Sequence, residues 1–383
     1  MRLLYIAPRL HPNQIGIMNG WKENGDEVFF LARKIGNNED HSIVKPDIIT
    51  YSWISRLFIS IYKIIKRNDA YAGNIDLLYG FPSGRKIYKY LKKIRPDIVI
   101  LREKSLYSIV CNRQCNKLKI STLVYNQNPV MVVPEDLKRD ALHKIVDGML
   151  PEKRITPVWE KYDGKEKVKD KNAIFLPFVV SPKCMPEEKK YFYDNIINLI
   201  DVGKFEKRKN HILLLKVFKK IIEKHPDVRL QIVGNMNDDD SFARSELNKV
   251  NQFIKDNNLT KAVRVYVNVP HDEMDLKYRM SDIYVLPSTS EPAAVSHLEA
   301  MSYSIPAICS TGNATASYIQ NGISGYIFID NDEEDLYNKL DKALSDRKII
   351  VEMGKNAYKN VCDNYQFKNY YNTFKKMICN YML

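Results

Sequence analysis

The sequence predicts an α/β protein that is built from two tandem Rossmann-like domains. Short apolar runs alternate with helical patterns of about ten residues or more. This alternation restarts after a segment of Pro and charged residues at 181–190, and a chain of 383 residues can bury two separate cores. Because strands that are separated by helices pair in parallel, each half is expected to form a doubly wound parallel sheet.

The elements of the first half are recognised by apolar runs that Gly, Pro or charged residues bound. The expected elements are, in order, the strand 3–7, the helix 16–25, the strand 27–32, the helix 86–94 and the strands 98–102, 121–126 and 173–180. The apolar pattern lapses from Ser181 to Lys190, so the domain boundary is placed there. The first domain is therefore predicted to cover residues 1–185.

The second half repeats the same rhythm. Its expected elements are the strand 196–203, the helix 211–225, the strand 228–234, the helix 246–258, the strand 262–268, the helix 272–281, the strand 282–288, a helix that carries Glu299, and the strands 306–310 and 325–329. The second domain is thus predicted at 186–365. The remaining segment, 366–383, is an amphipathic pattern rich in Tyr and Lys, and we expect it to form a helix that packs toward the first domain.

The composition is that of a globular protein, with 45% hydrophobic and 27% charged residues, which excludes wholesale disorder. No apolar run approaches the ~20 residues that span a bilayer, and the chain starts directly with a strand rather than a signal peptide. These features predict a cytoplasmic protein. The six cysteines are scattered, which predicts reduced buried thiols and no metal site.

The net charge of +13 lies entirely in the first half of the chain. Residues 1–190 hold 34 Lys and Arg against 21 Asp and Glu, whereas residues 191–383 hold 25 against 25. A one-sided basic domain indicates an acidic partner, such as a nucleic acid, an anionic glycan or an anionic membrane surface. The alternative is a solvated surface that is rich in Lys through compositional bias.

Residues 53–67, WISRLFISIYKIIKR, have the pattern of a helix that lies at a membrane interface. The apolar side would consist of Trp53, Leu57, Ile61, Ile64 and Ile65, and the cations Arg56, Lys63, Lys66 and Arg67 lie mostly elsewhere. An ordinary core helix has the same periodicity. The basic first half favours the hypothesis that the protein docks peripherally on the cytoplasmic face of a membrane.

Two carboxylates, Glu291 and Glu299, stand eight positions apart in LPSTSEPAAVSHLEAM, residues 286–301. Glu291 follows an apolar strand, and Pro292 sits where a helix can begin. Ligands bind α/β proteins in the crevice at the carboxyl ends of parallel strands. Two acids at such a crevice favour the recognition of hydroxyl groups on a ligand such as a nucleotide sugar.

A basic turn follows the first strand of the second domain, where Gly203 and Lys204 precede Lys209 at the start of a helix. Gly lets the backbone approach a ligand, and a helix N-terminus with nearby ammonium groups suits a diphosphate. The alternative is a solvated basic turn made by Lys204, Lys207, Arg208 and Lys209. Neither the GxGxxG nor the GxxxxGK[ST] pattern is present, so those nucleotide-binding classes are disfavoured.

Taken in order, the segments VGKFEKRKNH, LQIVGN, YVLPS with the two acids, Thr311-Gly312-Asn313 and NGISGYIF resemble the second domain of the retaining glycosyltransferases of group one, or family four. The first half follows the family more loosely through LLYIA, GDEV, RPDIVI and STLVY. The resemblance implies the GT-B architecture, in which two Rossmann-like domains face each other across a cleft.

The resemblance also implies roles for individual residues. Lys204 and Lys209 match the cations that bind the donor diphosphate and offset charge on the leaving group. Glu291 matches the acid that contacts the transferred sugar, and Glu299 the one that holds the ribose. The implied donor set is completed by Gly203, Ser290, the backbone N–H groups near Ala294 and Val295, and the amides of Asn126 and Gln127. No metal or other cofactor is then required.

The first domain departs from the family in its loops. Asn126 and Gln127 stand after STLVY where many relatives have a His, and an amide cannot carry a proton. A single Gly16 replaces the usual pair of glycines. We expect Gly16, His11 and Arg102 on the acceptor side.

The function that the resemblance implies is a metal-independent, retaining transfer of a hexosyl or related sugar. The donor would be a nucleotide-diphosphate sugar and the acceptor a glycan or lipid-linked molecule, in the synthesis of a cell-surface polysaccharide or glycoconjugate. One alternative is a non-catalytic nucleotide-sugar-binding partner of such an enzyme. A nucleic-acid-binding protein is the second alternative, but no recognition module for nucleic acid is present.

Overall fold

A computed structural model describes residues 1–36, 39–65, 75–102, 105–137, 148–237 and 240–381. The chain forms two compact units, each with its own parallel sheet, which confirms the predicted fold class. Unit 1 consists of Met1–Pro157, Glu166–Val179 and Tyr370–Leu383, and unit 2 of Val158–Lys165 and Val180–Asn369. The middle segment of unit 1 thus ends six residues before the boundary expected at 185.

Unit 1 contains a seven-stranded sheet in the order β3-β2-β1-β4-β5-β7-β9, in which all neighbours are parallel. Its strands are β1 (Arg2–Ala7), β2 (Glu27–Ala32), β3 (Asp47–Ile48), β4 (Ile98–Arg102), β5 (Ser121–Tyr125), β7 (Arg154–Thr156) and β9 (Ala173–Phe175). A separate antiparallel pair joins β6 (Met131–Val132) to β8 (Val168–Lys169). The strand expected at 173–180 ends early, because Pro177 has no N–H to continue the ladder.

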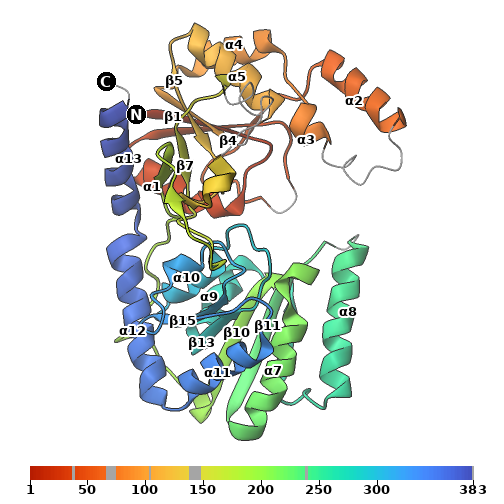
Figure 1. The fold of residues 1–383 in the computed structure, drawn as a ribbon, viewed down its shortest axis with the longest axis vertical. Coiled ribbons are helices and arrows are strands. Elements are labelled where there is room, and N and C mark those ends of the chain that lie inside the picture. Colours follow the sequence, from red (N-terminus) through yellow and green to blue (C-terminus); the bar gives the residue numbers. More distant parts are fainter. Residues whose placement is uncertain (37–38, 66–74, 103–104, 138–147, 238–239, 382–383) are drawn as a thin grey trace. The chain divides into compact units, whose positions relative to one another are not determined.

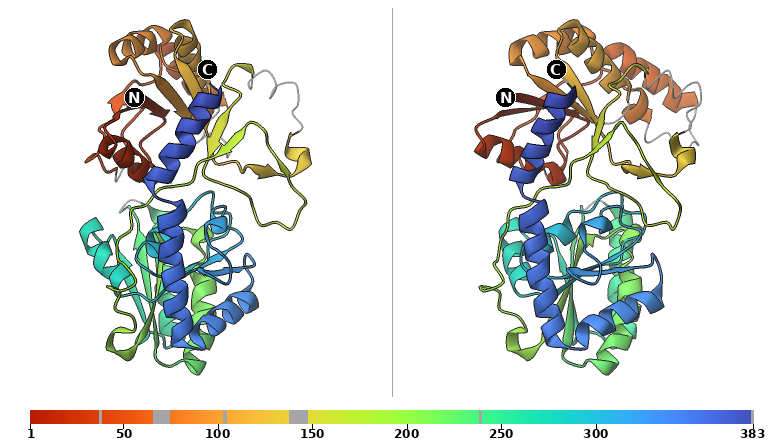
Figure 2. Two further views of the ribbon diagram at one scale, coloured as in Figure 1. Left: turned by 90° about the vertical axis from the view of Figure 1, so that its left-hand side faces the viewer. Right: turned by 60° about the vertical axis from the view of Figure 1, so that its left-hand side comes forward.

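The described helices of unit 1 are α1 (Ile15–Glu23), α2 (Trp53–Ile65), α3 (Ile75–Tyr79), α4 (Gly84–Ile94), α5 (Leu106–Lys117) and, from Tyr370 on, the C-terminal α13 (Phe367–Tyr381), with short 3-10 turns at Pro12–Gln14 and Pro134–Leu137. Helix α13 lies beside α1 (Figures 1 and 2). An aromatic cluster joins the two helices, in which the ring of the buried Trp21 lies 5.0 Å from that of Phe374 and 6.0 Å from that of Tyr370. The end of the chain therefore belongs to the hydrophobic core of unit 1.

Unit 2 contains a six-stranded parallel sheet in the order β12-β11-β10-β13-β14-β15. Its strands are β10 (Ile197–Lys204), β11 (Val228–Asn235), β12 (Val263–Val267), β13 (Ile283–Leu286), β14 (Ala307–Ser310) and β15 (Gly325–Phe328). Its helices are α7 (His211–Lys224), α8 (Ser241–Asp256), α9 (His271–Arg279), α10 (Ser296–Met301), α11 (Glu333–Leu344) and α12 (Arg347–Asn364), with 3-10 turns at Tyr193–Asn195, Lys207–Lys209 and Ala316–Tyr318. The strand order reverses between β10 and β13, which is where such sheets bind ligands.

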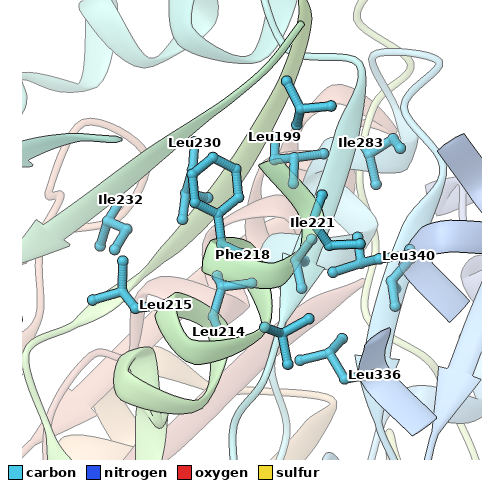
Figure 3. Close-up of a cluster of buried hydrophobic side chains, with 14 of the residues drawn as sticks. Leu199, Leu214, Leu215, Phe218, Ile221, Leu230, Ile232, Ile283, Leu336 and Leu340 are labelled. Atoms are coloured by element: carbon cyan, nitrogen blue, oxygen red, sulfur yellow. The ribbon is translucent and has the colours of Figure 1, made fainter. Parts of the chain in front are cut away.

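The core of unit 2 forms because α7 carries apolar residues at helical spacing on the side that faces the sheet. Leu214 and Phe218 of α7 are fully buried against Leu199 and Leu230 of the strands (Figure 3). Leu336 of α11 closes the same cluster. This packing fixes the start of α7 relative to the end of β10, and the candidate site lies at that junction.

Within the described part of the chain, no helix combines the length and the apolar character that crossing a membrane requires.

Candidate functional site

Lys209 occupies the centre of the site, at the junction between β10 and α7. Gly203 at the end of β10 makes this possible, because a Cβ atom at that position would lie 3.1 Å from both Cδ and Cε of Lys209. The Lys209 side chain thus runs directly across the backbone of Gly203, and it is only 9% exposed. An ammonium group that is buried to this extent requires a partner.

Glu291 is that partner. The Lys209 Nζ atom lies 2.6 Å from Glu291 Oε2, and the Arg208 guanidinium donates to the same oxygen. Arg208 also donates from Nε to Glu206 at 2.7 Å. The structure therefore places two cations on one buried carboxylate at the carboxyl ends of β10 and β13.

These cations determine the charge of Glu291. Burial by itself would raise the pKa of this carboxyl, but Lys209 and Arg208 outweigh that effect and hold the pKa below its ordinary value. Glu291 is consequently ionised at neutral pH. An ionised carboxylate accepts hydrogen bonds from hydroxyl groups and has no proton to donate, so the geometry favours ligand binding over general acid catalysis.

The backbone around Glu291 is held by the loop after β14. The Glu291 N–H donates to Gly312 O at 2.9 Å, and Glu291 O accepts from the Ala314 N–H at 3.0 Å. The expectation that Pro292 begins a helix is wrong, because these bonds keep the chain extended and α10 starts only at Ser296. Glu291 is thereby held in a position that faces Lys209.

Two backbone groups expected to face a ligand differ in their surroundings. The Ala294 N–H points to Asn313 Oδ1 at 3.5 Å, so it is directed into unit 2. Val295 is the residue that precedes α10, and its carbonyl accepts the first helical bond, from Glu299 N at 2.9 Å. Ser290 is exposed and has a positive φ of 49°.

His211 fixes the turn that carries the cations. Its Nδ1 lies 2.7 Å from Asp201 Oδ2 and its Nε2 lies 3.3 Å from Lys204 O, so it ties the end of β10 to the start of α7. Burial would lower the pKa of His211, but the Asp201 carboxylate raises it above the ordinary value. His211 is therefore a positioning residue.

The other expected donor residues of unit 2 lie at the surface. Lys204 carries an exposed side chain that forms no ion pair with any residue the structure describes. Glu299 is exposed, and its Oε2 accepts from Tyr278 Oη at 3.3 Å. Tyr278 in turn stacks on Tyr303, with ring centroids 5.1 Å apart. The sequence predicts Arg208 only as part of a solvated turn. Its contact with Glu291 cannot be predicted from the residues beside it in the sequence.

His297 lies between Glu291 and Glu299 in the sequence. Its side chain is fully buried and has a packing role. Its Nε2 lies 3.1 Å from Thr315 O, and its ring lies 5.8 Å from that of Tyr318. Burial lowers the pKa of His297 to about 4, so the imidazole is neutral in the folded protein.

This buried imidazole makes the protein less stable in acid. The unfolded state gains a proton near pH 6.5 and the folded state only near pH 4, so the stabilisation present above pH 6.5 is lost as the pH falls toward 4. At pH 5 the expected loss is about 2 kcal/mol. We predict that the free energy of unfolding falls between pH 7 and pH 5 by about 2 kcal/mol less in His297→Gln than in the wild type. Chemical unfolding at the two pH values measures the difference. Equal losses in the two proteins would contradict this account.

In unit 1 the two expected donor-side amides have internal partners. Asn126 Oδ1 accepts from Arg154 at 3.1 Å and from the Asn128 N–H at 3.2 Å. Arg154 also forms an ion pair with Asp170 at 3.0 Å. The Gln127 side chain lies close to the Tyr125 hydroxyl. Asn126 is thus part of the structure that holds the loop after β5.

The expected acceptor-side residues lie at three places in unit 1, with Gly16 in α1, His11 in the loop before the 3-10 turn and Arg102 at the end of β4. Gly16 is required where it stands, because a Cβ atom would lie 2.5 Å from Val179 O. The carbonyl of His11 accepts from the Gln14 N–H at 3.0 Å and begins the turn before α1. Arg102 lies 5.7 Å from the ring of Tyr125.

Arg102 also lines a small cavity at the carboxyl ends of β1, β2 and β4. Arg33, at the end of β2, contributes a second guanidinium to its wall, and Tyr51 and Tyr107 contribute aromatic rings. The cavity holds about one water molecule, so a sugar does not fit inside it. Two cations at the switch point of the sheet nevertheless mark this edge as the basic end of unit 1.

Comparison with known proteins finds a described family that resembles the part of the chain that carries the site. Residues 187–360 match the family model of glycosyl transferases group 1. The chain is 28% identical over 163 residues to the sulfoquinovosyl transferase SQD2 of Arabidopsis thaliana, a match that covers 42% of this chain and 29% of that protein. It is 25% identical over 199 residues to the capsular polysaccharide biosynthesis glycosyltransferase CapM of Staphylococcus aureus, and this match covers 50% of each chain.

The fold is also that of a solved structure, Alr3699/HepE of Anabaena in complex with UDP-glucose. The TM-score is 0.68 at 12% identity, over 99% of this chain and 100% of that one. This likeness shows the shared fold alone. The sequence matches, by contrast, span at most about half the length of these two curated relatives.

Proposed function

Since residues 187–360 match the family model of the group 1 glycosyl transferases, we propose that the chain belongs to this family and transfers a sugar from a nucleotide-diphosphate sugar to a glycan or lipid-linked acceptor. Unit 2 would bind the donor and unit 1 the acceptor. The observation that carries the proposal is the buried contact of Lys209 and Arg208 with Glu291 at the switch point of the unit 2 sheet.

The chemistry of this cluster fits a sugar nucleotide. The diphosphate leaving group gains negative charge as the glycosidic bond breaks, and prearranged cations stabilise that charge more in the transition state than in the ground state. Lys209 and Arg208 are such cations, and the exposed Lys204 adds a third at the rim. Glu291, which is ionised, would accept a hydrogen bond from a hydroxyl group of the sugar.

We propose further that transfer needs no metal ion and retains the anomeric configuration. The lysine and arginine cations meet the charge of the leaving group directly, which supports the first part. The resemblance to the retaining family supports the second. Transfer that persists in the presence of EDTA, and a product whose anomeric proton coupling matches that of the donor, are the expected results.

The basic first half of the chain supports an acidic or lipid-linked acceptor, because Arg33 and Arg102 lie together at the carboxyl edge of the unit 1 sheet. SQD2 and CapM are transferases by name, and CapM acts in capsular polysaccharide biosynthesis. A role in the synthesis of a cell-surface polysaccharide or glycoconjugate is proposed from these relatives.

The experiment that tests the function is incubation of the purified chain with UDP-, GDP- and ADP-sugars, with and without glycan and lipid-linked acceptors. Release of the nucleoside diphosphate together with a glycosylated product is the expected outcome. Binding of a sugar nucleotide without hydrolysis or transfer would instead favour a non-catalytic partner of a transferase. Tight binding of RNA or DNA at ~150 mM salt without any sugar nucleotide binding would favour the nucleic-acid alternative.

A further inference from the structure

Helix α2 exposes most of its apolar side chains. Trp53 is 70% exposed, Phe58 65% and Ile64 72%. Four further apolar or aromatic residues of the same helix are exposed, namely Ile54, Leu57, Ile61 and Tyr62. Figures 1 and 2 show α2 beside α3 at the margin of unit 1, away from the sheet. The possibility that this segment is an ordinary core helix is therefore wrong for the described residues, 53–65.

The exposed residues form one continuous face. At about 100° per residue, Trp53, Leu57, Ile61 and Ile64 fall within an arc of roughly 80°. Among the side chains of α2 that the structure describes, the two buried ones, Ser55 and Ile59, lie on the opposite side and attach the helix to the unit. We call the exposed side, made by the seven residues named above, the apolar face of α2. Soluble proteins rarely leave so large a contiguous apolar surface in water unless it binds something.

The segment that carries this face is basic, and its charge indicates the kind of partner. Residues 53–95 hold ten Lys and Arg against two Asp, a net of +8. Helix α4 contributes five exposed cations, and an exposed Arg follows directly after its end: they are Arg85, Lys86, Lys89, Lys92, Lys93 and Arg95. A shallow hollow between α4 and α5 is lined by Arg85 together with Arg113 and Lys117. Lys66 and Arg67, which also belong to the sequence pattern, lie outside the described residues.

We propose that the apolar face of α2 docks unit 1 on an anionic phospholipid surface. Trp53, Phe58 and Ile64 would enter the boundary between headgroups and acyl chains, while the cations of α4 attract the acidic headgroups. A second copy of the chain is a poorer occupant, because it would bring two surfaces of net positive charge together. A nucleic acid is a poorer occupant as well, because it has no use for the apolar face.

The docking is tested with the full chain and without any sugar nucleotide, so the result does not depend on transfer activity. Co-sedimentation is measured with phosphatidylcholine vesicles and with vesicles that also contain phosphatidylglycerol, from about 50 to about 300 mM salt. We expect binding to the anionic vesicles that weakens as the salt concentration rises. Phosphatidylcholine alone should bind far less protein.

Paired variants separate the contribution of the apolar face of α2 to vesicle binding from that of the cations of α4. Trp53→Ser combined with Phe58→Ser is expected to weaken binding to anionic vesicles about tenfold or more. The matched control is Phe242→Ser, because Phe242 lies on α8 of unit 2 and is 85% exposed. Lys86→Gln combined with Lys89→Gln should weaken binding about tenfold at low salt. Its control is Lys255→Gln combined with Lys261→Gln, which removes two exposed cations of unit 2.

The exposed positions leave the fold intact, which circular dichroism of each variant checks. Three results would overturn the proposal. They are the absence of binding to anionic vesicles at low salt, equal binding by the wild type and the Trp53→Ser, Phe58→Ser variant, and a dimer in light scattering that this variant dissociates. The last result would assign the apolar face to a second copy of the chain.

Discussion

Replacement of Lys209 by Ala is expected to reduce kcat/KM for sugar transfer by about two to three orders of magnitude. Lys209 is the most deeply buried cation of the site, and its Nζ lies 2.6 Å from Glu291. Removal of this charge takes away stabilisation of the leaving diphosphate, which is needed most in the transition state. Initial rates at saturating acceptor, across a range of donor concentrations, measure the effect.

Stability must be separated from activity in this variant. Removing one partner of a buried ion pair typically costs about 3–5 kcal/mol. Arg208 remains on Glu291, so we expect a smaller loss and a folded protein at assay temperature. Lys207→Ala is the matched control, because Lys207 lies in the same turn with an exposed side chain. If Lys209→Ala is as active as Lys207→Ala, the assignment of Lys209 to the diphosphate is incorrect.

Replacement of Glu291 by Gln should affect the binding of the diphosphate and the transfer of the sugar differently. The change keeps the shape of the side chain but removes the negative charge that Lys209 and Arg208 neutralise. Both cations then become available to the ligand, so a free nucleoside diphosphate should bind at least as tightly as to the wild type. Transfer should fall by about two orders of magnitude, because the acceptor for the sugar hydroxyl is weakened.

Calorimetric titration measures the affinity for the nucleoside diphosphate and for the nucleotide sugar, and the transfer assay measures the change in rate. Glu206→Gln serves as the control, since Glu206 is the other carboxylate on Arg208 but is largely outside the buried cluster. We expect less than about threefold change in that variant. Weaker binding of the free nucleoside diphosphate by Glu291→Gln would contradict a role for Glu291 on the sugar side.

Much of the fold was predictable because the chain alternates short buried strands with amphipathic helices. The apolar spacing in 211–225 specifies α7, and the run that ends at Leu286 specifies β13, since both patterns follow directly from which face is buried. The order of motifs indicates the family whose model residues 187–360 match, and it predicts that Gly203, Lys209 and Glu291 share one site.

Other features depend on contacts between distant segments, which local sequence does not encode. The helix expected at Pro292 is replaced by an extended segment, because Glu291 is bonded to the loop at Gly312. The contact of Arg208 with Glu291 joins residues 83 positions apart. For α2, the periodicity of the sequence is the same whether the apolar face meets a core or solvent. The exposure of Trp53 and Ile64 becomes known only from the structure.

The central claim is that the cluster around Lys209 and Glu291 binds a nucleotide-diphosphate sugar. Its most direct test is the thermal unfolding of the wild type and of Lys209→Ala with UDP-, GDP- and ADP-sugars, because a ligand that binds only the folded state raises its stability. We predict that at least one sugar nucleotide raises the Tm of the wild type by several degrees and leaves that of Lys209→Ala nearly unchanged. An equal rise in both proteins, or no rise with any of these donors, would contradict the account.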